Sequence, residues 1–412
     1  MKILYISYDG MTDPLGQSQV IPYLSGLTVK GYEILLISCE KKSKETKEYS
    51  DIKNDLALKN IKWFPLRYTS KPPVLSTVFD IWKINRLAKK IIRNYKIDAI
   101  HCRSYIAALT GLKMKNKFGT KFIFDMRGFF ADERVDGNLW NIKNPLYKQV
   151  YNYFKKKEKL FFTHADYIIS LTKSAKEEIL KWKLSSGPLK IKVIPCCADL
   201  KLFNKKNIDD NKKNKWFEKF KIQKADFIIS YLGSIGTWYL LDEMLDFFKV
   251  LSNKKESAKF LFITHENPEN ILEKAKQRKI STDKIIIQKA NRYEVPELLA
   301  LSNISMFFIK PVFSKKASSP TKMGEIMGMG IPLICNGNVG DVDLIMNETK
   351  SGIVIDSFNE TEYNKAINEI DNVLKISPEI ICAYAEKYFS LEKGIEKYDE
   401  VYKSLMTIEN EQ

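Results

Sequence analysis

The residue types best suited to chemistry lie at positions 317–335, which read ASSPTKMGEIMGMGIPLIC. Small polar residues and a proline lead into a short helical run, so hydroxyl groups and free backbone amides stand at a helix start. Lys322 and Glu325 are three residues apart and share one face of that helix. The pair could be a surface ion pair. However, the preceding strand ends at Lys310 and delivers this segment to the edge of a sheet, which favours a ligand site.

A glycine loop lies between a predicted strand and an amphipathic helix in the second half of the chain. Its small residues are Gly233, Ser234, Gly236 and Thr237. Glycine lets a phosphate approach the backbone closely, and the two hydroxyl groups can donate hydrogen bonds to it. A similar turn follows the first strand, where the helix dipole and the free amides of Gly16, Gln17 and Ser18 could hold an anion. Both loops are also compatible with purely structural turns.

A loop with charged and aromatic residues occurs in the sequence KFIFDMRGFFADERVDG, which starts at residue 121. Asp125 and Arg127 are two residues apart, so both side chains should point to the same side of the strand. Glu133 and Arg134 form a second charged pair beyond the glycine and the aromatic residues. This pattern is typical of a sugar or acceptor site, and the alternative is a buried ion pair that fixes the loop.

Alternating strands and helices must position these loops. Short apolar runs rich in Ile and Tyr are separated by segments with helical spacing, a pattern that predicts doubly wound parallel sheets. The runs in the first half cover 2–8, 32–38, 98–104, 121–127, 166–172 and 191–195. The runs in the second half cover 226–234, 258–265, 284–289, 304–310, 331–336 and 351–356.

The predicted domain boundary lies near residue 200, because a Lys- and Asn-rich connector at 204–220 separates the two sets of strands. We therefore expect an α/β protein in which residues 1–200 and residues 201–376 form two Rossmann-like domains that face each other across a cleft. Residues 377–412 are predicted to form a helix that packs back toward the first domain. A ligand would bind in the cleft, outside the carboxyl ends of the strands.

The composition is that of a globular protein with a large core, since 44% of the 412 residues are hydrophobic. Six cysteines lack regular spacing and no run of about 18 apolar residues occurs, so a reducing, cytoplasmic location is expected. Residues 1–200 contain 36 Lys and Arg against 19 Asp and Glu, whereas residues 201–412 contain 31 of each. The basic half either faces an anionic membrane or nucleic acid, or merely reflects a Lys-rich composition.

The chain resembles the GT-B glycosyltransferases, and among them glycosyltransferase family 4, whose members are retaining enzymes that use nucleotide-activated sugars. The resemblance extends along nearly the whole chain. ADYIISLTKSAKEEIL, VIPCCADLKLF and YFSLEKGIEKYDEVY are similar to the segment before the family's hinge, to the hinge and to the closing helix. The stretch at 317–335 resembles the donor-binding motif and is the most specific match.

The resemblance implies roles for individual residues. Glu325 would accept hydrogen bonds from the ribose hydroxyl groups of the donor, which suits a carboxylate with two acceptor oxygens. A turn whose amides approach the diphosphate and the sugar would consist of Ser319, Pro320, Thr321 and Lys322, preceded by the hydroxyl group of Ser318. Backbone groups usually bind the base in this fold, here around Ala290 to Tyr293, a segment that includes Arg292.

Three departures from the family pattern concern charged residues. Ala317 stands where an acidic residue usually contacts the transferred sugar. The glycine loop lacks the Arg and Lys that usually neutralise the leaving diphosphate, so Lys322, Lys310 or Arg127 would supply that charge. If none of these three residues supplies the charge, the enzyme would use a donor with different phosphate geometry, or the chain would be an inactive relative. Asp125 stands where many relatives carry a His near the reacting centre, and its role is either catalytic or structural.

No metal site is predicted. The sequence DVD at Asp341 to Asp343 mimics a metal-binding motif of another glycosyltransferase fold, but its position before an apolar run favours a helix cap at Asp341. His101, His164 and His265 have no Cys or His partner at ligand spacing. We therefore expect a metal-independent enzyme without a cofactor.

The predicted function is a retaining glycosyltransferase of the hexosyltransferase type. Its acceptor would be a glycan or a lipid-linked sugar in bacterial surface polysaccharide synthesis, such as capsule, O-antigen or exopolysaccharide. The protein would associate peripherally with the inner face of the membrane through its basic half. Two alternatives remain, a sugar-nucleotide epimerase of related fold and a basic nucleic-acid-binding protein. The second lacks a recognisable binding element with interleaved aromatic residues, so no nucleic-acid partner is expected.

Overall fold

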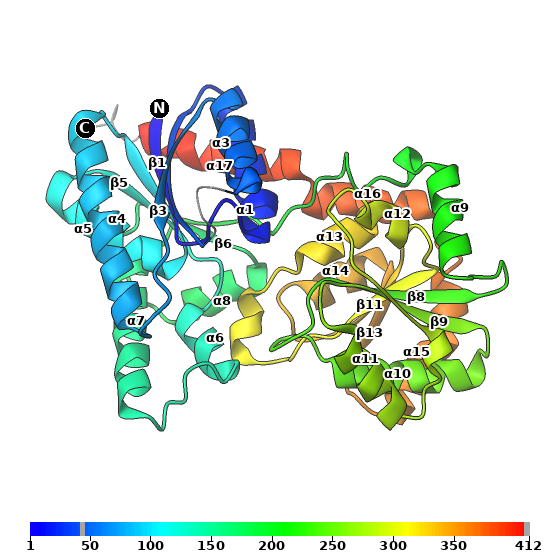
Figure 1. Cartoon of the computed structure of the whole chain (residues 1–412). Coiled ribbons are helices and arrows are strands. Elements are labelled where there is room, and N and C mark those ends of the chain that lie inside the picture. Colours follow the sequence, from blue (N-terminus) through cyan, green and yellow to red (C-terminus); the bar gives the residue numbers. More distant parts are fainter. Residues whose placement is uncertain (42–45, 408–412) are drawn as a thin grey trace. The chain divides into compact units, whose positions relative to one another are not determined.

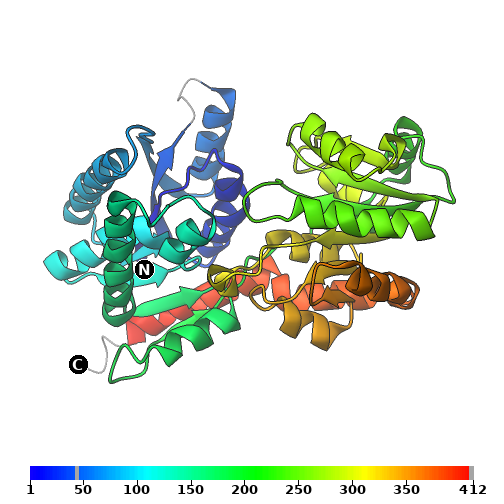
Figure 2. The same ribbon diagram turned by 90° about the horizontal axis from the view of Figure 1, so that it is seen from below.

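The computed structural model describes residues 1–41 and 46–407. The chain divides into two compact units, one comprising Met1–Pro195 with Leu391–Gln412 and the other comprising Cys196–Ser390. The division falls at Pro195, close to the expected position near residue 200. The segment predicted as one C-terminal helix forms two: α16 (Pro378–Phe389) belongs to the second unit, and α17 (Leu391–Thr407) returns to the first. Figure 2 shows α17, coloured red, within the first unit.

The first unit contains, within its described residues, a parallel sheet of seven strands in the order β3-β2-β1-β4-β5-β6-β7. The strands are β1 (Lys2–Ser7), β2 (Glu33–Glu40), β3 (Ile61–Arg67), β4 (Ala99–Arg103), β5 (Lys121–Asp125), β6 (Tyr167–Ser170) and β7 (Ile191–Val193). The sequence pattern did not indicate β3, because this edge strand contains Pro65 and consists mostly of half-buried residues rather than an apolar run.

Helices cover both faces of the first sheet (Figure 1). They are α1 (Pro14–Gln19), α2 (Ile21–Val29), α3 (Lys47–Leu58), α4 (Leu75–Asn94), α5 (Ser104–Phe118), α6 (Phe130–Asp136), α7 (Pro145–His164), α8 (Lys173–Lys181) and α17. α17 packs against α2, and α4 packs against α5. The last helix of the chain therefore completes the layer that begins with the first helices.

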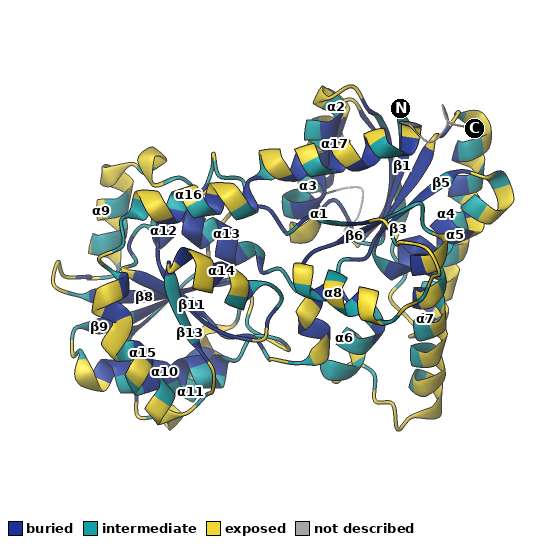
Figure 3. Cartoon of the chain, turned by 180° about the vertical axis from the view of Figure 1, so that it is seen from behind, coloured by how far each residue is buried: buried dark blue, intermediate teal, exposed yellow. Residues whose placement is uncertain are grey.

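The second unit contains, among the residues described, a parallel sheet of six strands in the order β10-β9-β8-β11-β12-β13. The strands are β8 (Phe227–Leu232), β9 (Ala258–Ile263), β10 (Ile285–Gln288), β11 (Ile304–Phe307), β12 (Leu333–Asn336) and β13 (Gly352–Ile355), and all coincide with predicted apolar runs. Every residue of β8, β11 and β12 is buried, as strands covered on both faces require. Figure 3 shows β8 in the colour of buried residues.

The helices of the second unit pack closely on its sheet and on one another. They are α9 (Asp210–Lys219), α10 (Leu241–Lys254), α11 (Pro268–Gln277), α12 (Val295–Leu299), α13 (Thr321–Gly328), α14 (Val342–Thr349), α15 (Glu360–Val373) and α16, with 3-10 turns η1 (Lys205–Asn207), η2 (Thr282–Lys284) and η3 (Phe313–Ala317). A Cβ atom at Gly324 of α13 would lie 2.7 Å from the Cβ of Phe389. Glycine therefore lets α13 approach α16.

Candidate functional site

The strand order of the second sheet reverses between β8 and β11, and a crevice opens outside the carboxyl ends of parallel strands at such a switch point. The glycine loop at 233–237 follows β8, and the segment 308–320 connects β11 to α13. An isolated antiparallel bridge between Tyr239 and Ile309 joins the two segments. The side chain of Asn336 accepts a hydrogen bond from the Ile309 amide at 2.7 Å and donates one to its carbonyl at 2.9 Å. Two of the predicted ligand-binding segments thus meet at one fixed edge.

Lys322 lies beside the glycine loop, although it belongs to the first turn of α13. Its side chain is buried, and Nζ donates a hydrogen bond to the Tyr231 hydroxyl at 3.1 Å, which in turn donates to the carbonyl of Ser234. The same nitrogen lies 3.6 Å from the ring centroid of Tyr239 and 4.2 Å from that of Tyr231. Gly233 has a φ of 114°, and a Cβ atom there would approach Nζ to 3.0 Å. Two aromatic rings and a glycine therefore form the site of this amine.

Lys322 and Glu325 are both shifted toward their neutral forms. Burial lowers the pKa of the Lys322 ammonium well below its usual value, and the nearby Glu325 carboxylate opposes that change. Burial also raises the pKa of Glu325, while Arg292 and Lys322 act in the opposite direction. The nearest cation to Glu325 is Arg292, whose Nη1 lies 3.9 Å from Oε1.

The Glu325 carboxylate offers acceptor oxygens that the protein itself does not use. Within residues 1–41 and 46–407, no donor forms a hydrogen bond to this side chain, although only 13% of its surface is exposed. The carboxylate keeps some contact with solvent and receives no hydrogen bond from the protein, so its oxygens are available to a ligand. The arrangement favours a ligand that brings hydroxyl groups to this position.

A second lysine lies on the aromatic side of the same loop. Lys315, in η3, is buried, and its Nζ lies 3.6 Å from the ring centroid of Trp238. Sequence reasoning missed this lysine and the three aromatic partners. The available signal was the consecutive pair Trp238 and Tyr239 directly after the glycine loop, since aromatic faces attract cations. The loop contains no cation of its own, but it contacts two lysines from the segment that follows β11.

The other residues predicted for this site lie around the same edge. Ser234, Gly236 and Thr237 are exposed, and Lys310 is half-buried. The hydroxyl oxygen of Ser319 accepts a hydrogen bond from the amide of Cys196 at 3.1 Å. Ser318 and Thr321 are half-buried, and no side chain caps the start of α13, where Pro320 occupies the N-cap position. The hydroxyl groups and amides of this helix start are thus placed where an anionic ligand could use them.

The predicted base-binding segment is fixed from the neighbouring loop. The Nε2 atom of His265 lies 2.9 Å from the carbonyl oxygen of Ala290. The guanidinium of Arg292 lies 5.7 Å from the ring centroid of Phe203, while Tyr293 is exposed. The loop brings Arg292 to Glu325, so the structure joins it to the edge formed by β8 and β11.

Asp125 ends β5 in the first unit and has no exposed surface. Its Oδ2 accepts a hydrogen bond from Tyr398 at 3.0 Å and lies 3.5 Å from His101 Nε2 and 3.8 Å from Arg127 Nη1. Burial raises the pKa of Asp125, but Arg127 and His101 outweigh it and hold the pKa below its usual value. The structural alternative, a buried ion pair, is the arrangement found. A direct catalytic contact by Asp125 is incompatible with this burial.

Two residues of α17 complete this cluster, and sequence reasoning missed both. Tyr398 binds Asp125, and the Tyr402 hydroxyl lies 2.8 Å from Nδ1 of His101. Burial lowers the pKa of His101, which favours the neutral imidazole. The regular spacing of tyrosines in the last helix was visible in the sequence, but their partners come from strands about 270 to 300 residues earlier.

Arg127 remains a candidate for contact with a ligand. Its φ of 58°, two residues after β5, and the φ of 67° at Ser104, directly after β4, are left-handed conformations. In residues other than glycine, such conformations cost about 1–3 kcal/mol and cluster at functional sites. Glu133 and Arg134 lie in α6 after this turn, and the Arg134 guanidinium lies 5.1 Å from the ring centroid of Phe130.

In the loop between β1 and α1, just before the predicted anion site, a carboxylate of the protein binds the backbone amides. Glu40, at the end of β2, is buried and accepts hydrogen bonds from the amides of Met11 and Thr12 at 2.8 and 3.1 Å. The hydroxyl group of Thr12 donates a third bond at 2.8 Å. Sequence reasoning missed Glu40, because nothing local indicates that the end of one strand supplies the anion for the loop of its neighbour.

The residues named for that anion site serve the turn itself. The amide of Gln17 donates to the carbonyl of Asp13, and the hydroxyl group of Ser18 donates to the carbonyl of Pro14. A Cβ atom at Gly16 would lie 2.2 Å from a carbonyl oxygen of the preceding loop, so Gly16 is required for packing. The Gln17 amide and the Ser18 hydroxyl group are therefore already bound within the protein, and the role of Gly16 in an anion site stays a prediction.

The acidic pair at Asp341 and Asp343 lies at the start of α14. Asp341 occupies the N-cap position, but its side chain makes no capping hydrogen bond, and Asp343 instead accepts one from the amide of Asn338 at 2.8 Å. No group of three or more His, Cys, Asp or Glu side chains suited to a metal ion occurs in the part of the chain that the structure describes.

Two family models match the chain. The model described as Glycosyltransferase Family 4 matches residues 20–202, and the model described as Glycosyl transferases group 1 matches residues 212–373. Each match lies almost entirely within one of the two units. No curated protein matches the chain.

Solved structures share the fold over nearly the whole chain. A glycosyltransferase from Rickettsia africae has 19% identity and a TM-score of 0.72, with 98% of each chain covered. Sucrose-phosphate synthase from Thermosynechococcus elongatus has 13% identity and a TM-score of 0.76, covering 99% of this chain and 100% of that chain. The Anabaena protein HepE in complex with UDP and glucose has 12% identity and a TM-score of 0.70, covering 98% of this chain and 100% of that chain. At these identities the likeness establishes the fold alone.

Proposed function

Because the chain belongs to the family 4 type of GT-B glycosyltransferases, we propose that it moves a sugar from a nucleotide-activated donor to an acceptor hydroxyl group with retention of configuration. The observation that carries this proposal is the Glu325 carboxylate, to which no donor of the described residues forms a hydrogen bond, next to the Lys322 amine at the switch point of the second sheet. A nucleoside diphosphate sugar offers hydroxyl groups to the Glu325 carboxylate and negative charge to the Lys322 amine.

Binding of the donor follows from the chemistry of these groups. The two oxygens of Glu325 suit the vicinal hydroxyl groups of a ribose, and the uncapped start of α13 suits a diphosphate. HepE, which shares the fold, binds UDP and glucose in its solved structure. A nucleoside diphosphate sugar is therefore the donor class that we propose.

Departure of the diphosphate requires positive charge. The glycine loop has no Arg or Lys, and we propose that Lys322 supplies the charge, with Lys315 and Lys310 nearby on the same segment. Charge on the leaving group is greatest in the transition state, so a cation there accelerates transfer more than it tightens binding. In the first unit, Arg127 is the candidate on the acceptor side, and Asp125 acts as a positioning residue that holds it.

The acceptor that we propose is a glycan or a lipid-linked sugar of a bacterial surface polysaccharide. The support is indirect and comes from the basic first half of the chain, which suits an anionic membrane surface. No helix in the described residues has the length and apolarity to span a membrane, so the proposed association is peripheral. We also propose that transfer needs neither a metal ion nor a cofactor.

A panel of nucleotide sugars tests the proposal. The full chain is incubated with UDP-, GDP-, CMP- and dTDP-linked sugars, with a metal chelator or with Mg²⁺ or Mn²⁺, and nucleotide release is read by mass spectrometry. We expect release from one donor class, no effect of the chelator and little release by the Glu325→Gln variant. With an acceptor alcohol added, the anomeric configuration of the new glycosidic bond, read by NMR, tests retention.

The same panel distinguishes sugar transfer from epimerisation, the alternative activity. An epimerase would convert the sugar without an acceptor and yield a new nucleotide sugar of the same mass, which chromatography resolves. No release and no epimer from any donor, together with intact binding of UDP, would indicate an inactive relative.

A further inference from the structure

Helix α4 has one continuous exposed face in the first unit. Its buried residues, which recur every three or four positions and pack against the rest of the unit, are Ser76, Asp80, Ile84, Ala88 and Ile91. The opposite side starts with large apolar residues that are each at least half exposed, namely Leu75, Val78, Phe79 and Trp82. It continues with the exposed cations Arg86, Lys90 and Arg93. The exposed side thus has an apolar half and a cationic half.

The apolar half is an organised surface patch. The rings of Phe79 and Trp82 stack with centroids 5.7 Å apart. The Nζ of Lys83 lies 5.1 Å from the centroid of Phe79, and the guanidinium of Arg86 lies 5.7 Å from that of Trp82. A contiguous patch of this kind on the surface of a folded unit marks an interaction site more often than scattered apolar residues do.

The cationic half continues onto α5 through two exposed lysines, Lys113 and Lys117. The ammonium group of Lys117 lowers the pKa of Lys89, which indicates that like charges are crowded here. Residues 81–124 contain eleven Lys and Arg but one acidic residue, Asp98, which accepts a hydrogen bond from the amide of Lys2.

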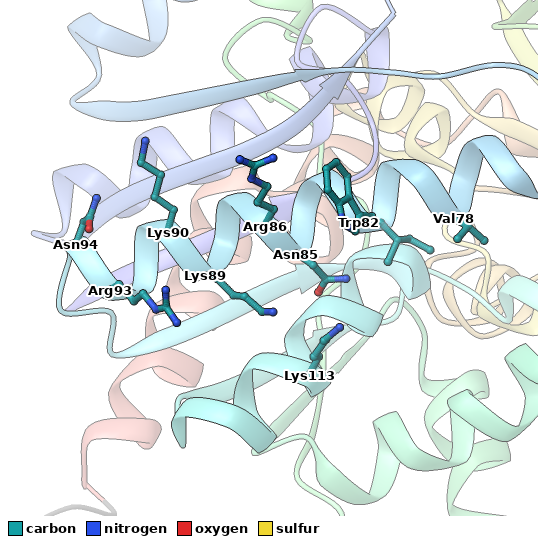
Figure 4. A pocket seen from close by; sticks show the side chains of 10 residues that line it. Val78, Trp82, Asn85, Arg86, Lys89, Lys90, Arg93, Asn94 and Lys113 are labelled. Carbon is teal, nitrogen blue, oxygen red and sulfur yellow. The ribbon is translucent and has the colours of Figure 1, made fainter.

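These cations have no carboxylate partner within the described residues. The set consists of Arg86, Lys89, Lys90, Arg93, Lys113 and Lys117. Figure 4 shows Lys89 and Arg93 on the side of α4 that faces Lys113, while Arg86, Lys90 and Trp82 project from the other side. All of these cations except Lys117 line, together with Trp82, a hollow of about 670 Å³. The hollow is positive and open, so it favours a partner with many negative charges.

Helix α7 is also basic, but its charges are arranged differently. Lys155 forms ion pairs with Asp132 at 2.8 Å and with Glu158 at 2.5 Å. Carboxylates therefore lie among the cations of α7, whereas α4 and α5 have none between their exposed cations. Lipid fits the α4 face better than nucleic acid does, because Leu75 and Val78 are aliphatic and the rings of Phe79 and Trp82 already stack on each other.

We propose that the exposed face of α4, with Lys113 and Lys117 of α5, docks on an anionic lipid leaflet. The apolar half would enter the boundary between headgroups and acyl chains, and the cationic half would contact lipid phosphates. This inference deepens the proposed function, because it rests on the proposal that the acceptor is borne by a membrane. It assigns the contact to one face of one helix pair rather than to the basic half in general.

Vesicle binding by the full chain tests the assignment. Co-sedimentation is measured with vesicles of phosphatidylcholine alone and with added phosphatidylglycerol. The triple variant Arg86→Gln, Lys90→Gln, Arg93→Gln should bind the anionic vesicles about 100-fold more weakly, since each basic residue near such a surface contributes about fivefold. Binding of the unchanged protein should fall steeply with salt and should be weak without phosphatidylglycerol.

A matched variant on α7 controls for net charge. The exposed lysines Lys148, Lys156 and Lys159 change to Gln, which removes the same three charges from the same unit. We expect this variant to keep most of its vesicle affinity. Equal losses in both triple variants, or no loss in the α4 variant, would overturn the assignment to this face.

Lipid contact by the apolar half has a separate measurement. Lipids brominated in the acyl chain should quench part of the tryptophan fluorescence, and this part should be lost in the Trp82→Phe variant. Quenching that is unchanged in that variant would overturn the insertion of this face. Loss of heparin or DNA binding in the α4 triple variant, with vesicle binding intact, would assign the face to a soluble polyanion.

The affinity for UDP distinguishes a failure of the docking proposal from a failure of the proposed glycosyltransferase activity. The triple variant on α4 should bind UDP as the unchanged protein does, because α4 lies in the first unit and the proposed donor site lies in the second. Vesicle binding as expected, in a protein that transfers no sugar, would support the docking surface and refute the proposed activity.

Discussion

At the residue scale, the candidate site is built from two groups that are incomplete without a ligand. Burial shifts Lys322 and Glu325 toward their neutral forms, and each partly restores the charge of the other. Tyr231 and Tyr239 give Lys322 a fixed position, but no oxyanion contacts its Nζ in the residues described. A diphosphate would provide the missing negative charge.

The Glu325→Gln variant should bind the donor nucleotide about 10-fold to 150-fold more weakly, because a hydrogen bond to a charged acceptor contributes roughly 1.5 to 3 kcal/mol. Isothermal titration calorimetry measures this change. Thermal unfolding should be nearly unchanged, since no donor in the described chain depends on this carboxylate. The exposed Glu369→Gln variant on α15 is the control. A nucleotide affinity equal to that of the control would contradict the assignment of Glu325 to the donor site.

The affinity for UDP should have a bell-shaped dependence on pH. As pH rises through the lowered pKa of Lys322, the ammonium group loses its proton and the attraction for the diphosphate disappears. As pH falls through the raised pKa of Glu325, the carboxylate gains a proton and accepts hydrogen bonds less well. Binding should also take up a proton at pH values above the Lys322 pKa, because the bound anion raises that pKa.

Two variants assign the limbs of this profile. Lys322→Met should remove the limb at high pH, and Glu325→Gln should remove the limb at low pH. Calorimetry in buffers of different ionisation enthalpy measures the proton uptake. A profile that stays unchanged in Lys322→Met would contradict the placement of this amine next to the phosphate. Turnover should fall more than affinity in the same variant.

At the element scale, the loop after β8 and the last helix of the chain do the positioning. The loop places aromatic rings around Lys322 because Gly233 adopts a φ of 114°, which other residues rarely adopt. Helix α17 places Tyr398 on Asp125 and therefore supports the residue pair at the end of β5.

A methyl group at Gly233 should disturb the Lys322 site. In Gly233→Ala the new Cβ atom lies 3.0 Å from Nζ and the backbone is strained, so we expect a stability loss of about 1–3 kcal/mol and weaker UDP binding. Gly236→Ala is a matched control for stability in the same loop, since nothing lies within 4 Å of its Cβ position. Urea unfolding compares the two variants and calorimetry measures UDP binding by Gly233→Ala, and equal stability of the two variants would refute the structural role of Gly233.

Loss of the Tyr398 hydroxyl group should destabilise the first unit. Tyr398→Phe leaves the buried Asp125 carboxylate without one donor, so we expect a loss of about 1.5 to 3 kcal/mol. Tyr402→Phe removes a bond to the neutral imidazole of His101 and should cost only about 1 kcal/mol. Urea denaturation ranks the two variants. A larger loss of stability in Tyr402→Phe than in Tyr398→Phe would show that Asp125 does not carry its charge in the folded protein.

At the scale of the whole molecule, the two units differ in how they are assembled from the chain. The second unit is one continuous segment with its own hydrophobic core. The first unit needs α17, whose Asp399 accepts a hydrogen bond from Tyr32 at 2.6 Å and whose Ile395 packs at Gly26.

Separate expression of the two units should reveal this difference. Residues 196–390 should unfold cooperatively as an isolated chain and should bind UDP. Residues 1–195 should be poorly folded alone, because α2 and the buried His101 lose their cover, and a linked segment 391–407 should restore folding. Circular dichroism and thermal melting measure both fragments. A stable fragment 1–195 without α17 would contradict this account.

The sequence by itself determined the described strands other than β3, the two-unit plan and the segments from which the candidate site is built. Apolar runs such as 226–234 and 331–336 are buried on both faces, and burial of that kind leaves a local pattern. The glycine loop and the helix start at Thr321 could also be predicted from the sequence, because turn residues and helix-start residues determine the backbone over only a few positions.

The tertiary structure decided which groups meet, because burial and neighbours depend on residues far apart in the chain. It set Lys322 against Tyr231 and Tyr239, and it placed the Glu40 carboxylate on the amides of the loop before α1. It also buried Asp125 beneath a tyrosine of the last helix. The exposed side of α4 became recognisable only once the packing of its other side was known, since a helical pattern alone does not tell which apolar residues stay in solvent.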